Sequence, residues 1–398
     1  MYMIINSGSS SIKFKLFSTD KDEKIITEGI AERIGIDGRL VINYQNEEHK
    51  FEDKMNDHNI AVEMILKKLL SLKIIENYNQ IETVGSRVVH GGEQIKESVV
   101  ITPETKEIIK KCIKLAPLHN PGALVAIEAF EKIIPNVLQV AAFDTSFHQS
   151  LAPEQYLYPV PNSWYDKYEV RKYGFHGISY KYICEHFGKV FKKDVKKLNL
   201  VICHLGNGSS VCCVKNGVSF DTTMGFTPLA GLMMGTRSGD IDSSVIEYMV
   251  KETNSDVFKI TQILNKESGL LGVSEVSSDM RDITAAASQN NSKAQKAFEM
   301  YTQRVAQTIV QYLNNLDREK IDGIVFTAGI GENSNIVRQA IIDKINIVNL
   351  EIDNKKNLEK YDDFKEISST KSEIKIYAFR TNEEQMILND IKKLKKNK

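Results

Sequence analysis

Three short turns made of small residues, at 6–11, 206–210 and 328–334, each follow directly after an apolar, strand-like run. The first two turns lead into a second strand, and the third leads into a helical pattern. Glycine lets backbone N–H groups approach phosphate oxygens, and the N-terminus of a following helix adds partial positive charge. Three such turns in one chain predict that it binds a phosphate-bearing ligand.

Five other segments are richer in polar residues and glycine than their surroundings, and most of the histidines lie in or near them. These segments are 85–92, 115–121, 143–148, 173–177 and 234–242. Clusters of His and Asp raise the hypothesis of a zinc site, but the sequence has no HxxxH, HExxH or paired-cysteine spacing. The five cysteines are odd in number and follow no metal-ligand spacing, which favours a reduced, cytosolic protein.

The elements that must position these segments alternate between strand-like and helix-like patterns, which indicates an α/β protein. Residues 137–143 read as a buried strand that places Asp144 at its C-terminal end. Thr102-Pro103 and Asn120-Pro121 each combine an N-cap residue with proline at the first helical position. Apolar residues at helical spacing over 298–316 predict a further amphipathic helix.

Residues 4–15 and 200–214 share one pattern of apolar strand, small-residue turn and apolar strand. This weak internal similarity predicts a duplicated domain with two equivalent hairpins. The length of 398 residues also favours two domains.

The overall charge is neutral, because Lys+Arg and Asp+Glu number 52 each. A neutral chain has no global field to draw it onto nucleic acid or an anionic membrane. No apolar run approaches the ~20 residues of a membrane span, and residues 1–6 lack the basic start of a signal peptide. Any bound anion must therefore be held by local chemistry.

Ten motifs, spread in order over nearly the whole chain, resemble those of the acetate kinase family, within the wider superfamily of acetate and sugar kinases, heat-shock proteins and actin. The matching segments are Asn6-Ser-Gly-Ser-Ser-Ser-Ile-Lys13, Arg87-Val-Val-His-Gly-Gly92, 115–121, Phe143-Asp144, Tyr173-Gly-Phe-His-Gly177, 204–210, 221–242, 268–281, 326–334 and Thr381-Asn-Glu-Glu384. Each motif is moderately specific, and the ordered set is highly specific.

The resemblance implies reversible, Mg²⁺-dependent transfer of the γ-phosphoryl group of ATP to acetate, giving acetyl phosphate and ADP. The acceptor carboxylate is already ionised at neutral pH, so the task is to bring two anions together and to stabilise a metaphosphate-like transition state. Arg87 matches the family arginine for the acetate carboxylate, and Arg237 matches the one for the phosphoryl oxygens. His176 and His119 match histidines that bind and orient the phosphoryl group. Asp144 matches the catalytic aspartate, which is expected to orient Arg237 or metal-bound waters.

The resemblance also implies binding positions for metal, nucleotide and acetate. Asn6 and Glu383 match the Mg²⁺ ligands, with Mn²⁺ as an alternative ion, and Lys13 is expected to reach the nucleotide phosphates. The other implied nucleotide-binding residues are His204, Leu205, Gly206, Asn207, Gly208, Asp279, Met280, Arg281, Gly329, Ile330, Gly331, Glu332 and Asn333. The implied pocket for the acetate methyl group consists of Val89, Leu118, Phe175 and Pro228. Because this set is bulky, propionate is expected to be a poor substrate.

The implied fold has two duplicated actin-like (ribonuclease H-like) α/β domains with the active site in the cleft between them. The expected domains are 1–148 together with 385–398, and 149–384. Residues 384–398 are expected to form a helix that packs on the first domain. The expected protein is a cytoplasmic homodimer that acts on small molecules and not on nucleic acid or membranes.

Five residues depart from the family pattern, namely Ser86, Ile178, Tyr180, Ala230 and Ser243. None of them removes an assigned catalytic group, but Tyr180 and Ala230 lie close in sequence to such groups and can change their hydrogen bonds. The alternatives are a propionate or butyrate kinase of the same superfamily, a non-kinase actin-like ATPase such as a chaperone or filament protein, and a non-catalytic nucleotide sensor.

Overall fold

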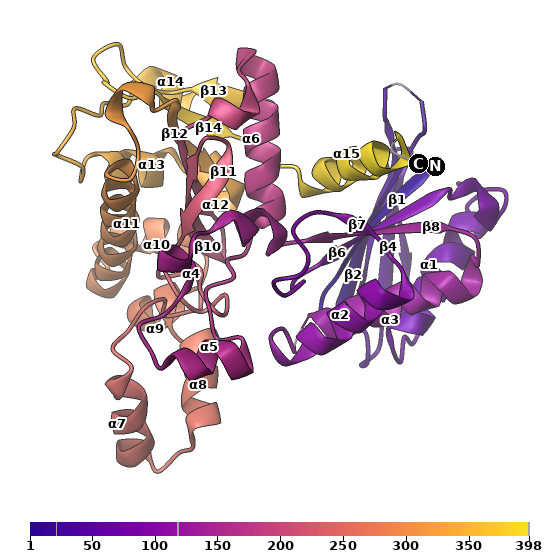
Figure 1. Cartoon of the computed structure of the whole chain (residues 1–398). Coiled ribbons are helices and arrows are strands. Elements are labelled where there is room, and N and C mark those ends of the chain that lie inside the picture. The colour runs from indigo at the N-terminus through magenta and orange to yellow at the C-terminus, as the bar shows by residue number, and fades with distance from the viewer. Residues whose placement is uncertain (21, 118, 397–398) are drawn as a thin grey trace. The chain divides into compact units, whose positions relative to one another are not determined.

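The computed structural model describes residues 1–20, 22–117 and 119–396. The chain forms two compact units (Figure 1). Unit 1 consists of Met1–Gln149 and Asn382–Lys398, and unit 2 consists of Ser150–Thr381. The domain assignment from the sequence, 1–148 with 385–398 and 149–384, stays a prediction, as does the cleft between the domains. Leu118, expected in the acetate pocket, lies outside the described residues.

Unit 1 is built on an eight-stranded sheet with the order β5-β4-β3-β2-β1-β6-β8-β7. Its strands are β1 Tyr2–Ser7, β2 Ser11–Phe17, β3 Ile25–Glu32, β4 Arg39–Tyr44, β5 Glu47–Phe51, β6 Thr83–Val88, β7 Val99–Val100 and β8 Leu138–Phe143. β1 to β5 form an antiparallel meander, whereas β1, β6 and β8 run parallel. The strand predicted to end at Asp144 is therefore confirmed as β8.

The helices of unit 1 cover both faces of this sheet. They are α1 His58–Ser71, α2 Pro103–Lys111, α3 Asn120–Ile133 and α15 Glu383–Lys396, with 3₁₀ turns at Tyr78–Gln80 and Cys112–Lys114 and a further turn, Ser146–Ser150, at the end of the unit. Apolar side chains of α1 and α3 pack with those of β1 and β2 in one buried core. Thr102 caps α2 as predicted, since its hydroxyl accepts a hydrogen bond from the Thr105 N–H.

The predicted C-terminal helix is confirmed as α15, which packs against β6, β1 and β8 (Figure 1). A Cβ atom at Gly85 of β6 would lie only 2.6 Å from Ile387 and 2.8 Å from Ile391, so glycine is what allows the helix to approach the strand. A buried hydrogen bond of 2.6 Å from Ser98 Oγ to Asp390 Oδ2 fixes the helix further. The last residues of the chain thus complete a unit that the first residues begin.

Unit 2 is built on a six-stranded sheet with the order β11-β10-β9-β12-β14-β13. Its strands are β9 Leu200–Leu205, β10 Ser209–Lys215, β11 Val218–Thr222, β12 Gly323–Thr327, β13 Phe364–Glu366 and β14 Ile376–Phe379. β9 and β10 form an antiparallel hairpin, and β9, β12 and β14 run parallel. The order β11-β10-β9-β12-β14 repeats the order β3-β2-β1-β6-β8 of unit 1, so the duplication predicted from the two hairpins is confirmed.

Helices also cover both faces of the second sheet. They are α4 Pro153–Tyr156, α5 Asn162–Tyr168, α6 Gly177–Phe191, α7 Ser244–Thr253, α8 Val257–Lys266, α9 Gly269–Ser274, α10 Met280–Ser288, α11 Ser292–Leu313, α12 Ala328–Asn333, α13 Asn335–Ile342 and α14 Asn354–Leu358, with 3₁₀ turns at Val195–Lys197 and Arg318–Lys320. α6 and α11 lie on opposite sides of the sheet (Figure 1), and every residue of β9 is buried. α11 is the amphipathic helix predicted over 298–316, with Tyr301, Val305 and Ile309 on its buried side.

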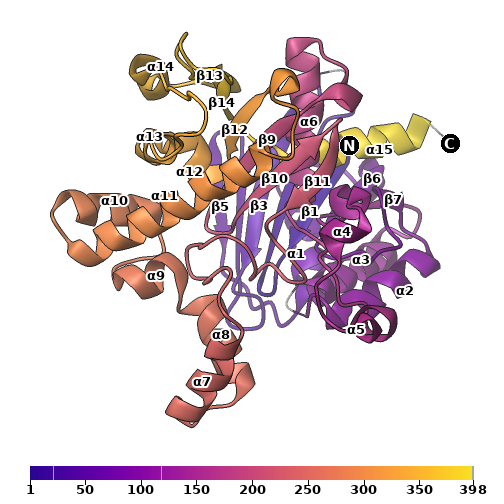
Figure 2. The same ribbon diagram turned by 60° about the vertical axis from the view of Figure 1, so that its left-hand side comes forward.

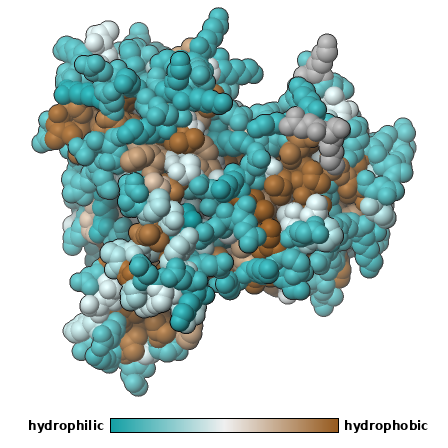
Figure 3. Space-filling model, viewed as in Figure 1, coloured by the Kyte–Doolittle hydropathy of each residue, from teal (hydrophilic) through white to brown (hydrophobic). Residues whose placement is uncertain are grey.

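A pair of helices, α7 and α8, extends away from the sheet of unit 2 (Figure 2). No residue of α7 is buried, and apolar side chains are exposed over this pair (Figure 3), with Phe258 82% accessible. Among the residues that the structure describes, no helix has both the length and the apolar character needed to cross a bilayer.

Candidate active site

In unit 1, strand register alone brings four predicted site residues to one edge of the sheet. Asn6 of β1 lies opposite Arg87 in the parallel partner β6 and opposite Lys13 in the antiparallel partner β2. Asp144 follows β8, which pairs with β6 up to Val88–Phe143. Because β1, β6 and β8 are parallel, their C-terminal ends meet at the same edge, which is where ligands bind in open α/β sheets.

Arg87 is the centre of this cluster. Its Nε and Nη2 donate to the two carboxylate oxygens of Asp144 at 3.1 and 2.5 Å, and its Nη1 donates to Asn6 Oδ1 at 3.1 Å. The Glu383 carboxylate at the start of α15 lies 3.7 Å from Arg87 Nε. Two predicted metal ligands, the predicted acetate arginine and the predicted catalytic aspartate are thus in one network.

The charges of this network shift its pKa values. Burial opposes the Arg87 cation, but the carboxylates of Asp144 and Glu383 outweigh it and raise the Arg87 pKa. Burial, together with the charges of Asp144 and Glu384, raises the pKa of Glu383 to about 7, although Arg87 acts in the opposite direction. Burial is the largest cause of this shift, because it penalises the charged form of the carboxyl group.

Asp144 has a partner that the sequence did not indicate, because its carboxylate forms a bidentate pair with Arg87. The expectation that it orients Arg237 or metal-bound waters stays a prediction. The pair follows from the register of β6 and β8, in which Arg87 lies opposite Ala142 and Asp144 comes two residues later. A planar carboxylate fixes a guanidinium best through two parallel hydrogen bonds.

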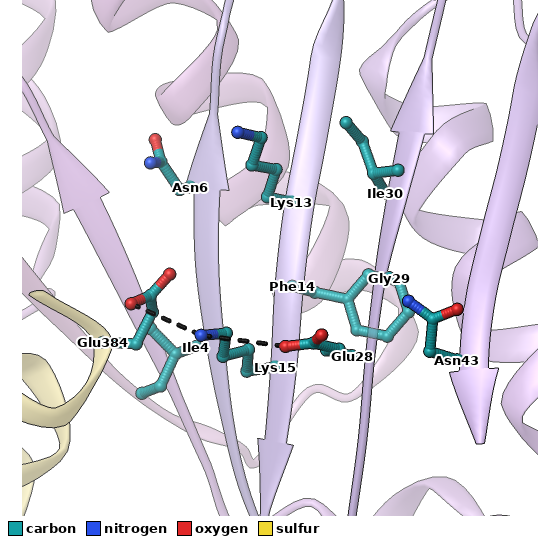
Figure 4. Close-up of a pocket in the computed structure, with 10 residues that line it drawn as sticks. All are labelled: Ile4, Asn6, Lys13, Phe14, Lys15, Glu28, Gly29, Ile30, Asn43 and Glu384. Atoms are coloured by element: carbon teal, nitrogen blue, oxygen red, sulfur yellow. Dashed lines mark ion pairs between the residues drawn. The ribbon is translucent and has the colours of Figure 1, made fainter. Parts of the chain in front are cut away.

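A pocket of about 250 Å³ opens beside Asn6 and Lys13 on the face of the sheet that α15 also covers (Figure 4). Asn6 and Lys13 lie side by side at one end of it. At the other end, Lys15 Nζ lies 3.7 Å from both Glu28 and Glu384. Lys15 is therefore neutralised by carboxylates of its own unit, whereas no ion pair is recorded for Lys13 within residues 1–20, 22–117 and 119–396.

His119 lies directly before α3, at the edge of the segment 115–121. The sequence predicted Asn120 as the N-cap of this helix, but Asn120 is its first residue and His119 occupies the cap position. The Asn120 side chain instead accepts from the His90 N–H at 3.1 Å and donates to the His90 carbonyl at 2.9 Å. These two bonds tie the segment of His119 to the segment of Arg87.

In unit 2, several of the predicted site residues lie around the turn Gly206–Gly208, which follows β9. A Cβ atom at Gly208 would lie 3.4 Å from Arg237 Nη1 and 3.5 Å from His176 Nε2. The loop before Arg237 also packs on this turn, since the Gly235 N–H donates to the Asn207 carbonyl at 3.0 Å. The space left open by the missing side chain of Gly208 thus faces both an arginine and a histidine.

Arg237 is partly buried, and its Nη1 donates to the Pro228 carbonyl at 3.3 Å and to Met234 Sδ at 3.7 Å. In the described part of the chain, no carboxylate forms an ion pair with it. Burial consequently lowers the pKa of Arg237, in contrast to Arg87. A partly buried guanidinium without a counter-ion offers a binding site for an anion.

His176 holds a left-handed backbone conformation, with φ of 58°, immediately before α6. Residues other than glycine seldom adopt this conformation, and it is concentrated at functional sites. Its Nδ1 lies 2.8 Å from Ser210 Oγ, and its ring stacks on His204 with centroids 4.0 Å apart. His204 is itself held by Ser179 Oγ, 2.9 Å from its Nδ1.

A larger pocket of about 560 Å³ in unit 2 contains many of the predicted nucleotide-binding residues. Its lining consists of Gly206, Asn207, Ser278, Asp279, Met280, Arg281, Thr284, Gly329, Ile330, Asn333, Ser334 and Asn335. β9 and β12 run parallel, so the turn after β9 and helix α12 after β12 meet at one edge of the sheet. The size falls within the range of about 300–1,000 Å³ that is typical of ligand pockets.

In the third small-residue turn, one backbone N–H group already has a partner within the protein, and phosphate binding by this turn stays a prediction. The Glu332 carboxylate accepts the Ala328 N–H at 3.0 Å, so the protein itself uses a donor at the start of α12. The same oxygen accepts the Thr381 N–H at 3.0 Å. The role of Glu332 in nucleotide binding stays a prediction.

The sequence did not point to Arg338, whose buried side chain donates hydrogen bonds to backbone carbonyls of α12. This side chain is 3% accessible, and its Nη1 donates to the Gly331 and Glu332 carbonyls at 2.8 and 2.9 Å. Its Nε and Nη2 donate to the side chain and the carbonyl of Asn357 at 2.8 and 3.1 Å. No local pattern marks Arg338, because its partners depend on the tertiary fold.

The residues expected around the acetate methyl group differ in their burial and in the unit to which they belong. Val89 is buried in unit 1 and Phe175 is buried in unit 2. Pro228 is partly buried, and its carbonyl accepts from Arg237 at 3.3 Å. Phe175 directly precedes His176, so these two members of the predicted pocket lie next to the predicted phosphoryl-binding side chains.

The described residues contain no group of three or more His, Cys, Asp or Glu side chains that could hold a metal ion. A Mg²⁺ ion requires less, because it keeps several waters and takes one or two protein oxygens besides phosphate oxygens. Asn6 and Glu383 offer hard oxygen donors, and both lie beside Arg87. This donor set fits Mg²⁺.

Comparisons with known proteins agree over the whole length. The sequence profile of the Acetokinase family matches residues 1–389. A relative named acetate kinase, from Mycoplasma mycoides subsp. mycoides, is 56% identical over 390 residues, which cover 98% of each chain. The crystal structure of Porphyromonas gingivalis acetate kinase covers 98% of both chains with a TM-score of 0.93 and 37% identity. That of a propionate kinase from Francisella tularensis subsp. tularensis also covers 98% of both, with a TM-score of 0.90 and 38% identity. The chain therefore belongs to the acetokinase family.

Proposed function

We propose that this protein catalyses the reversible transfer of the γ-phosphoryl group of ATP to acetate, by direct in-line displacement, to give acetyl phosphate and ADP. The observation that carries the proposal is the space at Gly208, which Arg237 Nη1 and His176 Nε2 both face. Arg237 has burial without a counter-ion, as an anion receptor requires. The nucleotide-sized pocket begins at the same turn, at Gly206 and Asn207.

The chemistry needs little from a base, because acetate is ionised at neutral pH. We propose that Arg237 and His176 stabilise the charge that spreads over the equatorial phosphoryl oxygens. Arg87 would bind the acetate carboxylate, with its orientation fixed by the bidentate pair with Asp144. His119 would help to orient the phosphoryl group. The Asp144 carboxylate then acts through Arg87 and has no proton to remove.

We propose that Asn6 and Glu383 hold Mg²⁺, with Mn²⁺ as an alternative, and that Lys13 contributes charge to the nucleotide phosphates. Such an ion would neutralise phosphate oxygens when the nucleotide is bound. The remaining predicted nucleotide positions, including His204, Leu205 and Gly331, are part of the same proposal. Calorimetric titration of the protein with Mg²⁺ in the presence of ADP should detect binding of the ion. The affinity for Mg²⁺ should be at least tenfold weaker in Glu383→Gln.

Propionate phosphorylation is the second candidate, because one structural relative is named a propionate kinase. We propose acetate as the better substrate, since Val89, Phe175 and Pro228 are bulky or rigid. One methylene changes discrimination by only about 1–3 kcal/mol, so propionate should react more slowly and butyrate hardly at all. The values of kcat/KM for the three carboxylates decide between the two candidates.

The test of the overall reaction traps acetyl phosphate with hydroxylamine. Purified protein with Mg²⁺, ATP and acetate should give the hydroxamate, and protein without acetate should not. A chaperone-like or filament-like ATPase would release phosphate without forming hydroxamate, and a nucleotide sensor would bind ATP and form neither product. Parallel assays with GTP and pyrophosphate establish the preferred donor.

We also propose that the protein is a homodimer and that it is located in the cytoplasm. Phe258, Tyr248 and Val257 expose apolar surface on the α7–α8 pair, which favours an association surface. The five cysteines are buried and none of them is in a disulfide, as in proteins of reducing compartments. Light scattering after gel filtration should give about twice the chain mass of 45.0 kDa.

A further inference from the structure

A buried chain of hydroxyl groups leads from helix α6 to His176. The Tyr180 hydroxyl lies 2.5 Å from Ser210 Oγ, and Ser210 Oγ lies 2.8 Å from His176 Nδ1. Tyr180 and Ser210 are both inaccessible to solvent. Tyr180 stands one helical turn after His176, and Ser210 lies two residues after Gly208 on β10, so two elements converge on one ring nitrogen.

The other ring nitrogen of His176 faces the space at Gly208. A Cβ atom there would be 3.5 Å from His176 Nε2 and 3.4 Å from Arg237 Nη1. A neutral imidazole carries a proton on one nitrogen only, and the hydrogen bond at the other nitrogen determines which. Whatever holds Nδ1 therefore decides whether Nε2 presents a proton or a lone pair to an anion beside Arg237.

We propose that Tyr180 is a positioning residue that sets the tautomer of His176 through Ser210. The Tyr180 phenol donates to Ser210 Oγ, Ser210 donates to His176 Nδ1, and Nε2 therefore carries the proton that faces the space at Gly208. This inference rests on the proposed function, in which His176 donates to the transferring phosphoryl group.

The direction of the two hydrogen bonds follows from the donor strengths. A phenol is more acidic than an aliphatic hydroxyl, so between Tyr180 and Ser210 the phenol is the better donor. Burial also raises the pKa of Tyr180 well above its usual value, which keeps its proton in place at all working pH values. The stacked ring of His204 and the contact between Ser210 Oγ and Nδ1 both limit rotation of the His176 ring.

The direct test is the protonation pattern of the histidine rings in the full-length chain. Long-range ¹H–¹⁵N NMR of protein labelled at histidine distinguishes the two tautomers, and His176→Gln identifies the signals of His176. The wild-type signals should show a protonated Nε2. Tyr180→Phe should move them toward the other tautomer and lower kcat about tenfold, with the KM for ATP changed less than twofold.

The control is Tyr301→Phe. Tyr301 is equally inaccessible, and its hydroxyl lies 2.9 Å from Ser209 Oγ, the neighbour of Ser210. This variant loses an equivalent buried hydrogen bond and should be destabilised to a similar extent, but the signals of His176 should not move. A shift of these signals in Tyr301→Phe as large as in Tyr180→Phe would overturn the proposal.

A second variant keeps the proposal testable if Tyr180→Phe does not fold. Ser210→Ala breaks the same chain at its middle, and the double variant should lose no more kcat than the larger of the two single losses. A wild-type Nδ1–H tautomer, or multiplicative losses in the double variant, would contradict the relay. If the wild type makes no acetyl phosphate, the proposed function fails, and the NMR comparison still decides the role of Tyr180.

Discussion

Replacing Arg237 with methionine should abolish most of the activity and leave the free protein at least as stable as before. The structure indicates the direction of both the change in activity and the change in stability. Arg237 has burial without a carboxylate partner among the described residues, so the folded protein bears the cost of holding its charge. Removal of a buried charge in favour of an apolar side chain of similar length is neutral or stabilising by about 1–3 kcal/mol.

The loss of activity should be large, because this guanidinium faces the space in which we place the transferring phosphoryl group. An arginine in that position contributes about 10³–10⁵ in rate, or about 4–7 kcal/mol of transition-state stabilisation. Lysine at 237 should recover only part of this rate, since a single ammonium group cannot bridge two phosphoryl oxygens.

Arg87→Met is the matched comparison, because it removes a guanidinium that the protein itself neutralises. That substitution leaves the buried carboxylate of Asp144 and the partly buried carboxylate of Glu383 without their cation, so it should lower the free energy of unfolding by about 3–5 kcal/mol. Urea unfolding and the hydroxamate assay measure both variants. The reasoning is refuted if Arg237→Met is the less stable of the two, or if it keeps more than a tenth of the wild-type kcat.

Three further results are expected. Gly208→Ala should fold normally but lower kcat about 10²-fold, because its methyl group would occupy the space next to Arg237 and His176; steady-state kinetics and circular dichroism check this. Arg338→Met should raise the KM for ATP more than the KM for acetate and lower the free energy of unfolding by about 2–3 kcal/mol. The reason is that the carbonyl groups at the end of α12 lose their hydrogen-bond donor. A selective rise in the KM for acetate would argue against this. Burial lowers the pKa of His90 to about 4, below its ordinary value of 6.5, so the unfolded chain takes up a proton at a higher pH than the folded chain. The free energy of unfolding should therefore fall by up to about 3 kcal/mol between pH 6.5 and 4. His90→Asn should flatten this pH dependence, as measured by urea unfolding.

The fold was largely predictable because its main signals are local. The alternation of apolar residues on either side of two small-residue turns indicated both hairpins, and the structure pairs them as β1–β2 and β9–β10. The end of β8 at Phe143 and the buried stripe of α11 also follow from periodicity within a few residues. Such patterns depend on neighbours along the chain and survive without knowledge of the tertiary structure.

The site was less predictable wherever a side chain has a distant partner. Asn120 has the residue type of a helix cap, but its side-chain amide forms hydrogen bonds with the backbone of His90 instead. Asp144 binds Arg87 because β6 and β8 are in register, which no spacing in the sequence encodes. Arg338 gave no signal at all, and the turn 206–210 stood out without any sign that Ser210 contacts His176, since these partners lie on other elements. The types of residue could be read from the sequence, whereas their pairing required the structure.

The closing helix α15 also has a consequence for synthesis. Unit 2 is continuous in sequence, so all of its strands are available before translation ends. Unit 1 is not, because Ile387 and Ile391 fill the space at Gly85 and are synthesised only after all of unit 2. Domains usually fold in order from the N-terminus during synthesis. In this chain, one face of the first-made sheet therefore stays exposed until α15 has been synthesised. A message truncated shortly before codon 383 would leave that sheet open and remove Glu383 in the same event, so an incomplete chain would be marked by exposed apolar surface and would lack the proposed metal ligand.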